Sequence, residues 1–160
     1  MHAPDFTLTA DRGQAWTLSE QHRPFLLTFG FSHCADTCPA TLAKLTNVVR
    51  GLGTTGANLE IVMVSVDPRR DTPAALHRFV TRFDGPVVGL TGTPAQVGRV
   101  ETEYRVWAQR VPGKHHDRQS YDIAHTAVIY AIDGRGDIRA TVNDDDSDAA
   151  LTNTARELLH

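Results

Sequence analysis

Two kinds of apolar pattern alternate along this sequence. Continuous apolar runs rich in β-branched and aromatic residues predict buried strands over 25–29, 59–66 and 127–132, with a shorter strand over 86–90. After these runs, apolar residues recur every three or four positions, which is typical of helices that bury one face. Such helices are predicted to begin at four places, near Pro39, Pro73, Pro94 and Ser147.

Alternation of apolar and polar residues predicts strands of a different kind near the chain ends. A small N-terminal β-hairpin is predicted around the turn 11–13, and a second antiparallel hairpin around the turn 133–136. Residues 107–124 are polar and show neither period. They predict a long loop, and loops of this length are often functional.

The order of these elements predicts the fold class. Strands alternating with helices, followed by a hairpin and a last helix, indicate an α/β protein with a central mixed sheet and helices on both faces. Because a pair of cysteines follows the first buried strand, we expect a thioredoxin-like fold. It carries an N-terminal hairpin and a long loop insertion before the strand that follows His125. At 160 residues the chain suits one domain, 1–160.

Composition excludes some classes of function. The chain is 41% hydrophobic and 22% charged, with 19 acidic and 16 basic residues, which is an ordinary balance for a water-soluble domain. The basic residues are scattered, so nucleic acid is not an expected partner. No apolar run reaches the ~18–20 residues that span a bilayer, and no signal-peptide pattern opens the chain.

The chemistry is expected at the junction between the first buried strand and the helix that follows it. Both cysteines of the chain, Cys34 and Cys38, lie there. Two cysteines do not make a disulfide framework, so their close pairing indicates redox or metal chemistry. Their spacing allows either a disulfide or one shared metal ion. The start of a helix also favours the thiolate form.

The spacing favours metal binding over fast disulfide exchange. Cys34 and Cys38 are one residue further apart than in the Cys-x-x-Cys of thioredoxin, which gives room for an ion. His125 precedes the strand 127–132, at the place where a thioredoxin would bring its cis-proline beside the cysteines. Taken alone, His125 suits a hydrogen-bonded core group, and an unreactive buried cysteine pair is the simplest structural alternative. Together, two thiolates and an imidazole suit soft Cu(I).

Other polar residues have weaker claims on this chemistry. His33 adjoins the cysteines and is expected to act around the site rather than as a ligand. Asp67 suits either an acid supporting the ligands or a cap for the loop that follows it. His115 and His116 could form an accessory metal pair, although a solvated loop accounts for them more simply. The acids 144–146 are expected to be solvated at a helix start.

Four blocks of sequence resemble the Sco/SenC family over nearly the whole chain. They are Leu-Leu-Thr-Phe-Gly-Phe-Ser-His-Cys-Ala-Asp-Thr-Cys-Pro at 26–39, Val-Ser-Val-Asp-Pro-Arg-Arg-Asp-Thr-Pro at 64–73, Gly-Leu-Thr-Gly-Thr-Pro at 89–94 and Asp-Ile-Ala-His-Thr-Ala-Val-Ile-Tyr at 122–130. Their order and spacing also match the family. The resemblance implies a thioredoxin-fold copper protein with ligands at Cys34, Cys38 and His125. Ala35 stands where the family usually has proline, which removes no ligand.

The resemblance also implies function, partner and location. Sco/SenC proteins assemble the binuclear copper centre of cytochrome c oxidase, so we expect a copper metallochaperone rather than an enzyme with a small-molecule substrate. It would deliver Cu(I) or Cu(II) to the copper subunit, subunit II, or reduce its cysteines, and a further copper chaperone or thiol reductant could serve it. Family members work at the extracytoplasmic face of a membrane. We therefore expect an N-terminal anchor in the full-length protein, ahead of these residues.

Two other functions remain open from the residues alone. One is a thiol-disulfide oxidoreductase in which Cys34 attacks and Cys38 resolves. The other is a peroxiredoxin-like peroxidase, which the block 64–67 suits but which lacks a peroxidatic Thr-x-x-Cys pattern. His125 separates the first from a metal site, because ligation needs the imidazole and exchange does not.

Overall fold

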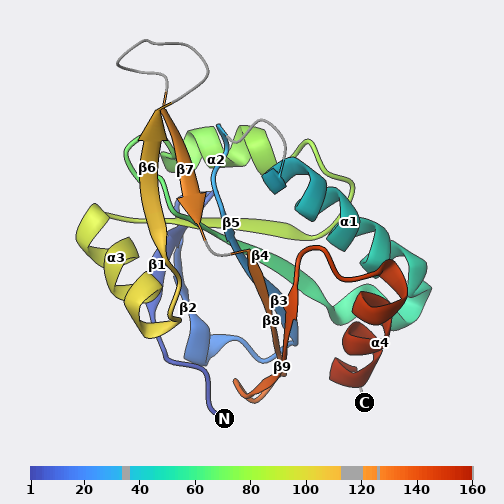
Figure 1. The fold of residues 1–160 in the computed structure, drawn as a ribbon. Coiled ribbons are helices and arrows are strands. Elements are labelled where there is room, and N and C mark those ends of the chain that lie inside the picture. Colours follow the sequence, from blue (N-terminus) through green and yellow to red (C-terminus); the bar gives the residue numbers. More distant parts are fainter. Residues whose placement is uncertain (34–36, 113–120, 126, 160) are drawn as a thin grey trace.

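The computed structural model describes residues 1–33, 37–112, 121–125 and 127–159, and it contains a seven-stranded mixed sheet (Figure 1). The order across the sheet is β2-β1-β5-β4-β3-β8-β9. The central strands β3, β4 and β5 are parallel, and the outer strands pair antiparallel. The strands are β1 (Thr7–Ala10), β2 (Ala15–Thr17), β3 (Phe25–Gly30), β4 (Glu60–Ser65), β5 (Val87–Thr91), β8 (Val128–Ile132) and β9 (Ile138–Asn143).

Helices cover both faces of this sheet, as the sequence predicts. The helices are α1 (Thr37–Gly51), α2 (Pro73–Val80), α3 (Pro94–Glu103) and α4 (Asp148–Leu158), with short 3-10 turns η1 (Leu18–Glu20) and η2 (Gly53–Asn58). Hydroxyl side chains cap three of the helix starts: Thr72, Thr93 and Ser147 each accept a backbone N–H of the first turn. The predicted starts of α2, α3 and α4 are therefore confirmed.

The two faces of the sheet bury separate sets of apolar side chains. Helices α1, α2 and α4 pack over Leu26, Ile61 and Met63, while α3 packs over the opposite face, which includes Leu27 and Val62 (Figure 1). Side chains of a strand alternate between faces, so a strand covered on both sides needs apolar residues at every position. This explains why the sequences of β3 and β4 are mostly apolar.

The segment predicted as a long loop before His125 contains a second sheet instead. β6 (Ala108–Pro112) pairs antiparallel with β7 (Tyr121–His125), and His125 ends β7 rather than opening the strand 127–132. This hairpin packs on the core through few side chains, Ala108 and Ile123 among them. A strand with so little buried surface carries no apolar period, and the sequence pattern therefore missed it.

The β8–β9 hairpin turns at Asp133, whose carboxylate holds the turn together. Asp133 Oδ1 accepts the backbone N–H groups of Arg135 and Asp137 at 2.9 and 3.0 Å, and Gly136 takes a positive φ of 86° within the turn. Burial raises the pKa of Asp133, but these bonds and Arg139 outweigh that effect and lower the pKa below its ordinary 3.8. Because the pKa of Asp133 is lower in the folded state, its carboxylate stabilises the fold at pH values above the unfolded-state pKa. This stabilisation is lost as the pH falls through the folded-state pKa.

Asp133→Asn is expected to reduce the free energy of unfolding at pH 7 by about 1 kcal/mol, because an amide oxygen is a weaker acceptor than a carboxylate. The difference from wild type should shrink below about pH 4, where the wild-type carboxyl becomes protonated. Urea unfolding at pH 7 and pH 3 measures both values. Asp84→Asn is the control, since the Asp84 side chain is 92% exposed in its ion pair with Arg50. A loss that is the same at both pH values would contradict the role given to the charge.

Candidate metal centre

The candidate site lies where the chain leaves β3 and enters α1. Because β3 and β4 are parallel and adjacent, their carboxyl ends share one edge of the sheet. The chain continues from Gly30 through Phe31, Ser32 and His33, and α1 begins at Thr37, so Cys38 lies in the first turn of this helix. Cys34 lies outside the described residues. The predicted strand-to-helix junction is thus confirmed.

His125 reaches the same region from the β6–β7 hairpin. Its ring meets the Phe31 ring edge-on, with centroids 6.0 Å apart and planes at 80°. His125 also lines a small pocket together with Thr41 and Leu42 of α1. Positions three and four residues apart share one face of a helix, so Cys38 lies on the face of α1 that carries Thr41 and Leu42. The fold therefore brings His125 to the helix face that carries Cys38.

The start of α1 has an electrostatic character that suits cysteine ligands. Helix N-termini carry partial positive charge from their unpaired N–H groups. The first turn of α1 contains no acidic residue that would offset it. This environment favours thiolate over thiol, and the thiolate is the form that binds a metal ion or attacks a disulfide. A thiolate at Cys38 and the imidazole of His125 are donors of the kinds that copper accepts.

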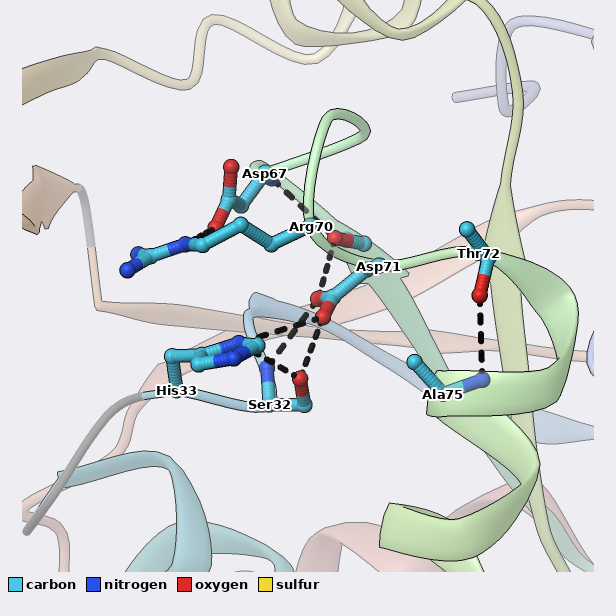
Figure 2. A network of polar contacts seen from close by, with 8 residues as sticks. Ser32, His33, Asp67, Arg70, Asp71, Thr72 and Ala75 are labelled. Carbon is cyan, nitrogen blue, oxygen red and sulfur yellow. Dashed lines mark hydrogen bonds and ion pairs between the residues drawn. The ribbon is translucent and has the colours of Figure 1, made fainter. Parts of the chain in front are cut away.

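Asp67, for which the sequence allows two roles, makes contacts within its own loop. Its buried carboxylate forms an ion pair with Arg70 (Figure 2). Its carbonyl accepts the N–H of Asp71 at 2.9 Å. The Arg70 guanidinium in turn lies 5.9 Å from the centre of the Phe31 ring. Asp67 is thereby connected to the Phe31 ring, which His125 contacts, through one intervening side chain, that of Arg70.

A second buried carboxylate, that of Asp71, was missed as a site residue. From the sequence, Asp71 belongs only to the start of a helix, but Thr72 caps α2 by accepting the N–H of Ala75 at 3.2 Å. Asp71 is fully buried and bonds Ser32 and Ser65. These two serines follow or end adjacent parallel strands, where the carboxyl ends meet. Two hydroxyls at neighbouring strand ends were the signal that could have found it.

The other polar residues that the sequence singled out differ in how they lie relative to the site. His33 is half exposed, with Nδ1 3.1 Å from Ser32 Oγ and 3.9 Å from Asp71 Oδ1 (Figure 2). His115 and His116 lie outside the described residues. Asp144, expected to be solvated, lines the pocket beside His125. Among the side chains that the structure describes, no three His, Cys, Asp or Glu residues are grouped to hold a metal ion.

Comparison with known proteins gives one consistent family. A family model described as SCO1/SenC matches residues 1–160. The human protein named Protein SCO1 homolog, mitochondrial, is 37% identical over 135 residues, which make up 82% of this chain and 44% of that protein. The chain spans 44% to 64% of the length of the curated relatives it matches.

Solved structures agree with this match. The structure of Bradyrhizobium japonicum ScoI with copper bound is 36% identical, has a TM-score of 0.84, and is matched over 99% of this chain and 98% of that one. The crystal structure of Arabidopsis thaliana ScoI with copper bound is 27% identical with a TM-score of 0.90, over 99% and 98% of the two chains. These matches confirm the predicted thioredoxin-like α/β fold. Within the described residues, no helix has the length and apolar character needed to cross a membrane.

Proposed function

Because this chain belongs to the SCO1/SenC family, we propose that it is the copper-binding domain of a metallochaperone that helps assemble the binuclear copper centre of cytochrome c oxidase. We propose Cys34, Cys38 and His125 as the copper ligands. The observation that supports this set is the position of His125, which lines one pocket with the helix face that carries Cys38. Copper bound in relatives of the same fold supports the choice of metal.

The donor set explains why copper is the cargo. Soft Cu(I) prefers thiolates, while Cu(II) prefers nitrogen ligands and a tetragonal arrangement. A site with two thiolates and one imidazole can therefore hold either oxidation state. Cys38 belongs to the first turn of α1 and His125 to a separate hairpin, so these two proposed ligands come from different elements of the fold.

The proposed recipient is the copper subunit of the oxidase, subunit II, which would receive copper or have its own cysteines reduced. A second copper chaperone or a thiol reductant would load the site or reduce its cysteines. We place the domain at the extracytoplasmic face of a membrane, held there in the full-length protein by an anchor. The mitochondrial name of the human relative supports a respiratory setting.

One structural observation also favours a second function, thiol-disulfide exchange. The start of a helix favours the thiolate form that exchange uses, and the first turn of α1 carries Cys38. In that case Cys34 would attack a disulfide of the partner and Cys38 would resolve the mixed disulfide. This function makes no use of the imidazole of His125.

The reduced protein is expected to bind about one copper ion per chain, and the oxidised protein to bind it poorly. A disulfide between Cys34 and Cys38 removes both thiolate ligands at once. Anaerobic titration with Cu(I) against a chromophoric competitor measures the stoichiometry and affinity of each form. Equal stoichiometry in the two redox states would overturn the proposed ligand set.

A further inference from the structure

We propose that Asp71 is a positioning residue for the copper site, since its buried carboxylate fixes the segment that leads from β3 to Cys34. This inference rests on the proposed function, because it concerns the placement of a proposed ligand. Asp71 itself is not proposed as a ligand. Its role is to fix the position, relative to β4, of the backbone that leads to Cys34.

The carboxylate joins three segments of the chain (Figure 2). Asp71 stands just before α2 and is fully buried. Its Oδ2 accepts the backbone N–H of Ser32 at 3.0 Å and the hydroxyl of Ser65 at 2.6 Å, while its Oδ1 accepts the hydroxyl of Ser32. Ser65 ends β4, and Ser32 follows β3 by two residues. One side chain thus binds the ends of two adjacent strands to the start of a helix.

Two of these three bonds restrain the segment next to the cysteines. Ser32 is two residues before Cys34, and both its N–H and its hydroxyl bond to Asp71. The N–H of Asp71 bonds in turn to the carbonyl of Asp67, which fixes the backbone that carries the carboxylate. The Asp71 carboxylate is therefore fixed at the end of β4, and it holds the backbone of Ser32, which precedes Cys34.

Burial makes this restraint difficult to replace. A buried carboxylate is costly unless donors satisfy it, and Asp71 has three. If the carboxylate is removed, the Ser32 N–H loses its acceptor, which is also costly inside a protein. Residues 31–33 then lower their free energy by moving toward water, which offers the N–H a new acceptor. Such movement displaces residues 31–33 relative to β4, and with them the backbone that leads to Cys34 and the Phe31 ring that His125 contacts.

The two serines provide a matched pair of variants. Ser32→Ala and Ser65→Ala each delete one hydroxyl that donates to Asp71, but only Ser32 belongs to the segment before Cys34. Asp71→Ala removes the whole restraint. Asp71→Asn keeps it in part, because the amide oxygen can accept the Ser32 N–H while the amide nitrogen donates to the Ser32 hydroxyl.

Copper affinity and the Cu(II) absorption spectrum are measured for all four variants beside the wild type. Asp71→Ala is expected to weaken Cu(I) binding by roughly 10-fold or more and to shift the thiolate-to-Cu(II) bands, as loss of a group that orients metal ligands does. Asp71→Asn should recover most of the affinity. Ser32→Ala should weaken binding, whereas Ser65→Ala should lower the unfolding midpoint and leave affinity within about twofold of wild type.

Three outcomes would overturn the proposal. They are wild-type affinity and spectrum in folded Asp71→Ala, an equal loss of affinity in both serine variants, and an Asp71→Asn that binds as poorly as Asp71→Ala. Should Asp71→Ala fail to fold, the serine pair decides alone.

A measurement without metal separates this proposal from the proposed function. Amide hydrogen exchange of the metal-free protein should speed up around residues 31–33 in Asp71→Ala and Ser32→Ala but not in Ser65→Ala. A wild type that binds no copper would reject the proposed function, and the exchange rates would still decide whether Asp71 restrains this segment. Unchanged exchange in Asp71→Ala would reject the positioning role.

Discussion

Cys34→Ala and Cys38→Ala are each expected to abolish tight copper binding. Apparent metal-binding free energies of about 10–16 kcal/mol are shared among a few ligands, so one thiolate accounts for roughly 100-fold or more in affinity. Alanine is well tolerated in the first turn of α1, where Cys38 stands, so the fold should survive that change. Competition titration of each reduced variant gives the affinity, and circular dichroism verifies the fold.

The matched control is the double variant His115→Ala with His116→Ala. These two residues are the other candidate metal ligands of the chain, and the proposed site does not include them. The double variant should therefore bind copper within about twofold of wild type. If it lost copper as completely as the cysteine variants, the site would have to be moved to the segment 107–124.

The central sheet could be predicted because its strands are buried on both faces. The sequences of β3 and β4 contain few polar residues, and a continuous apolar run of that length is typical of a strand covered on both sides. The starts of α2 and α3 could also be predicted from the sequence. Pro73 and Pro94 each follow a threonine that caps the helix, so the residue types at those positions reflect the local hydrogen bonding.

The β6–β7 hairpin could not be predicted for a related reason. Its strands form a separate two-stranded sheet by pairing with each other. Backbone pairing leaves no mark in the sequence unless one face is buried. As a result, the proposed site was assigned a histidine at a strand entrance, whereas His125 lies at the end of a hairpin strand.

For the candidate site, the sequence proposes a set of ligands but does not predict the residues that support them. Cysteine and histidine have few roles in combination, so the chemistry and the family resemblance both indicated Cys34, Cys38 and His125. Aspartate has many roles, and the position of Asp71 shortly before Pro73 fitted a helix start. Only the tertiary structure shows that Asp71 faces Ser32 and Ser65, because these residues come from three separate segments of the chain.

His125→Ala is expected to impair Cu(II) binding far more than Cu(I) binding, and it separates the two proposed functions. Without the imidazole, two thiolates can still hold Cu(I) linearly. Cu(II) prefers nitrogen and a four-coordinate tetragonal geometry, so it should lose most of its affinity, by roughly 100-fold, together with its characteristic thiolate charge-transfer bands. The Cu(II) absorption spectrum and competition titrations with both oxidation states measure these effects.

The control for this variant is His22→Ala. His22 is exposed and lies just before β3, whereas the candidate site lies beyond the other end of that strand. It should leave both copper affinities unchanged. The same pair of variants is then assayed for disulfide exchange with a model substrate. In a metallochaperone, His125→Ala alters the Cu(II) spectrum and leaves exchange largely intact, because exchange depends on the thiolates of Cys34 and Cys38. An unchanged spectrum with a collapsed exchange rate would instead establish the oxidoreductase, since the imidazole would then serve the thiols and not the metal.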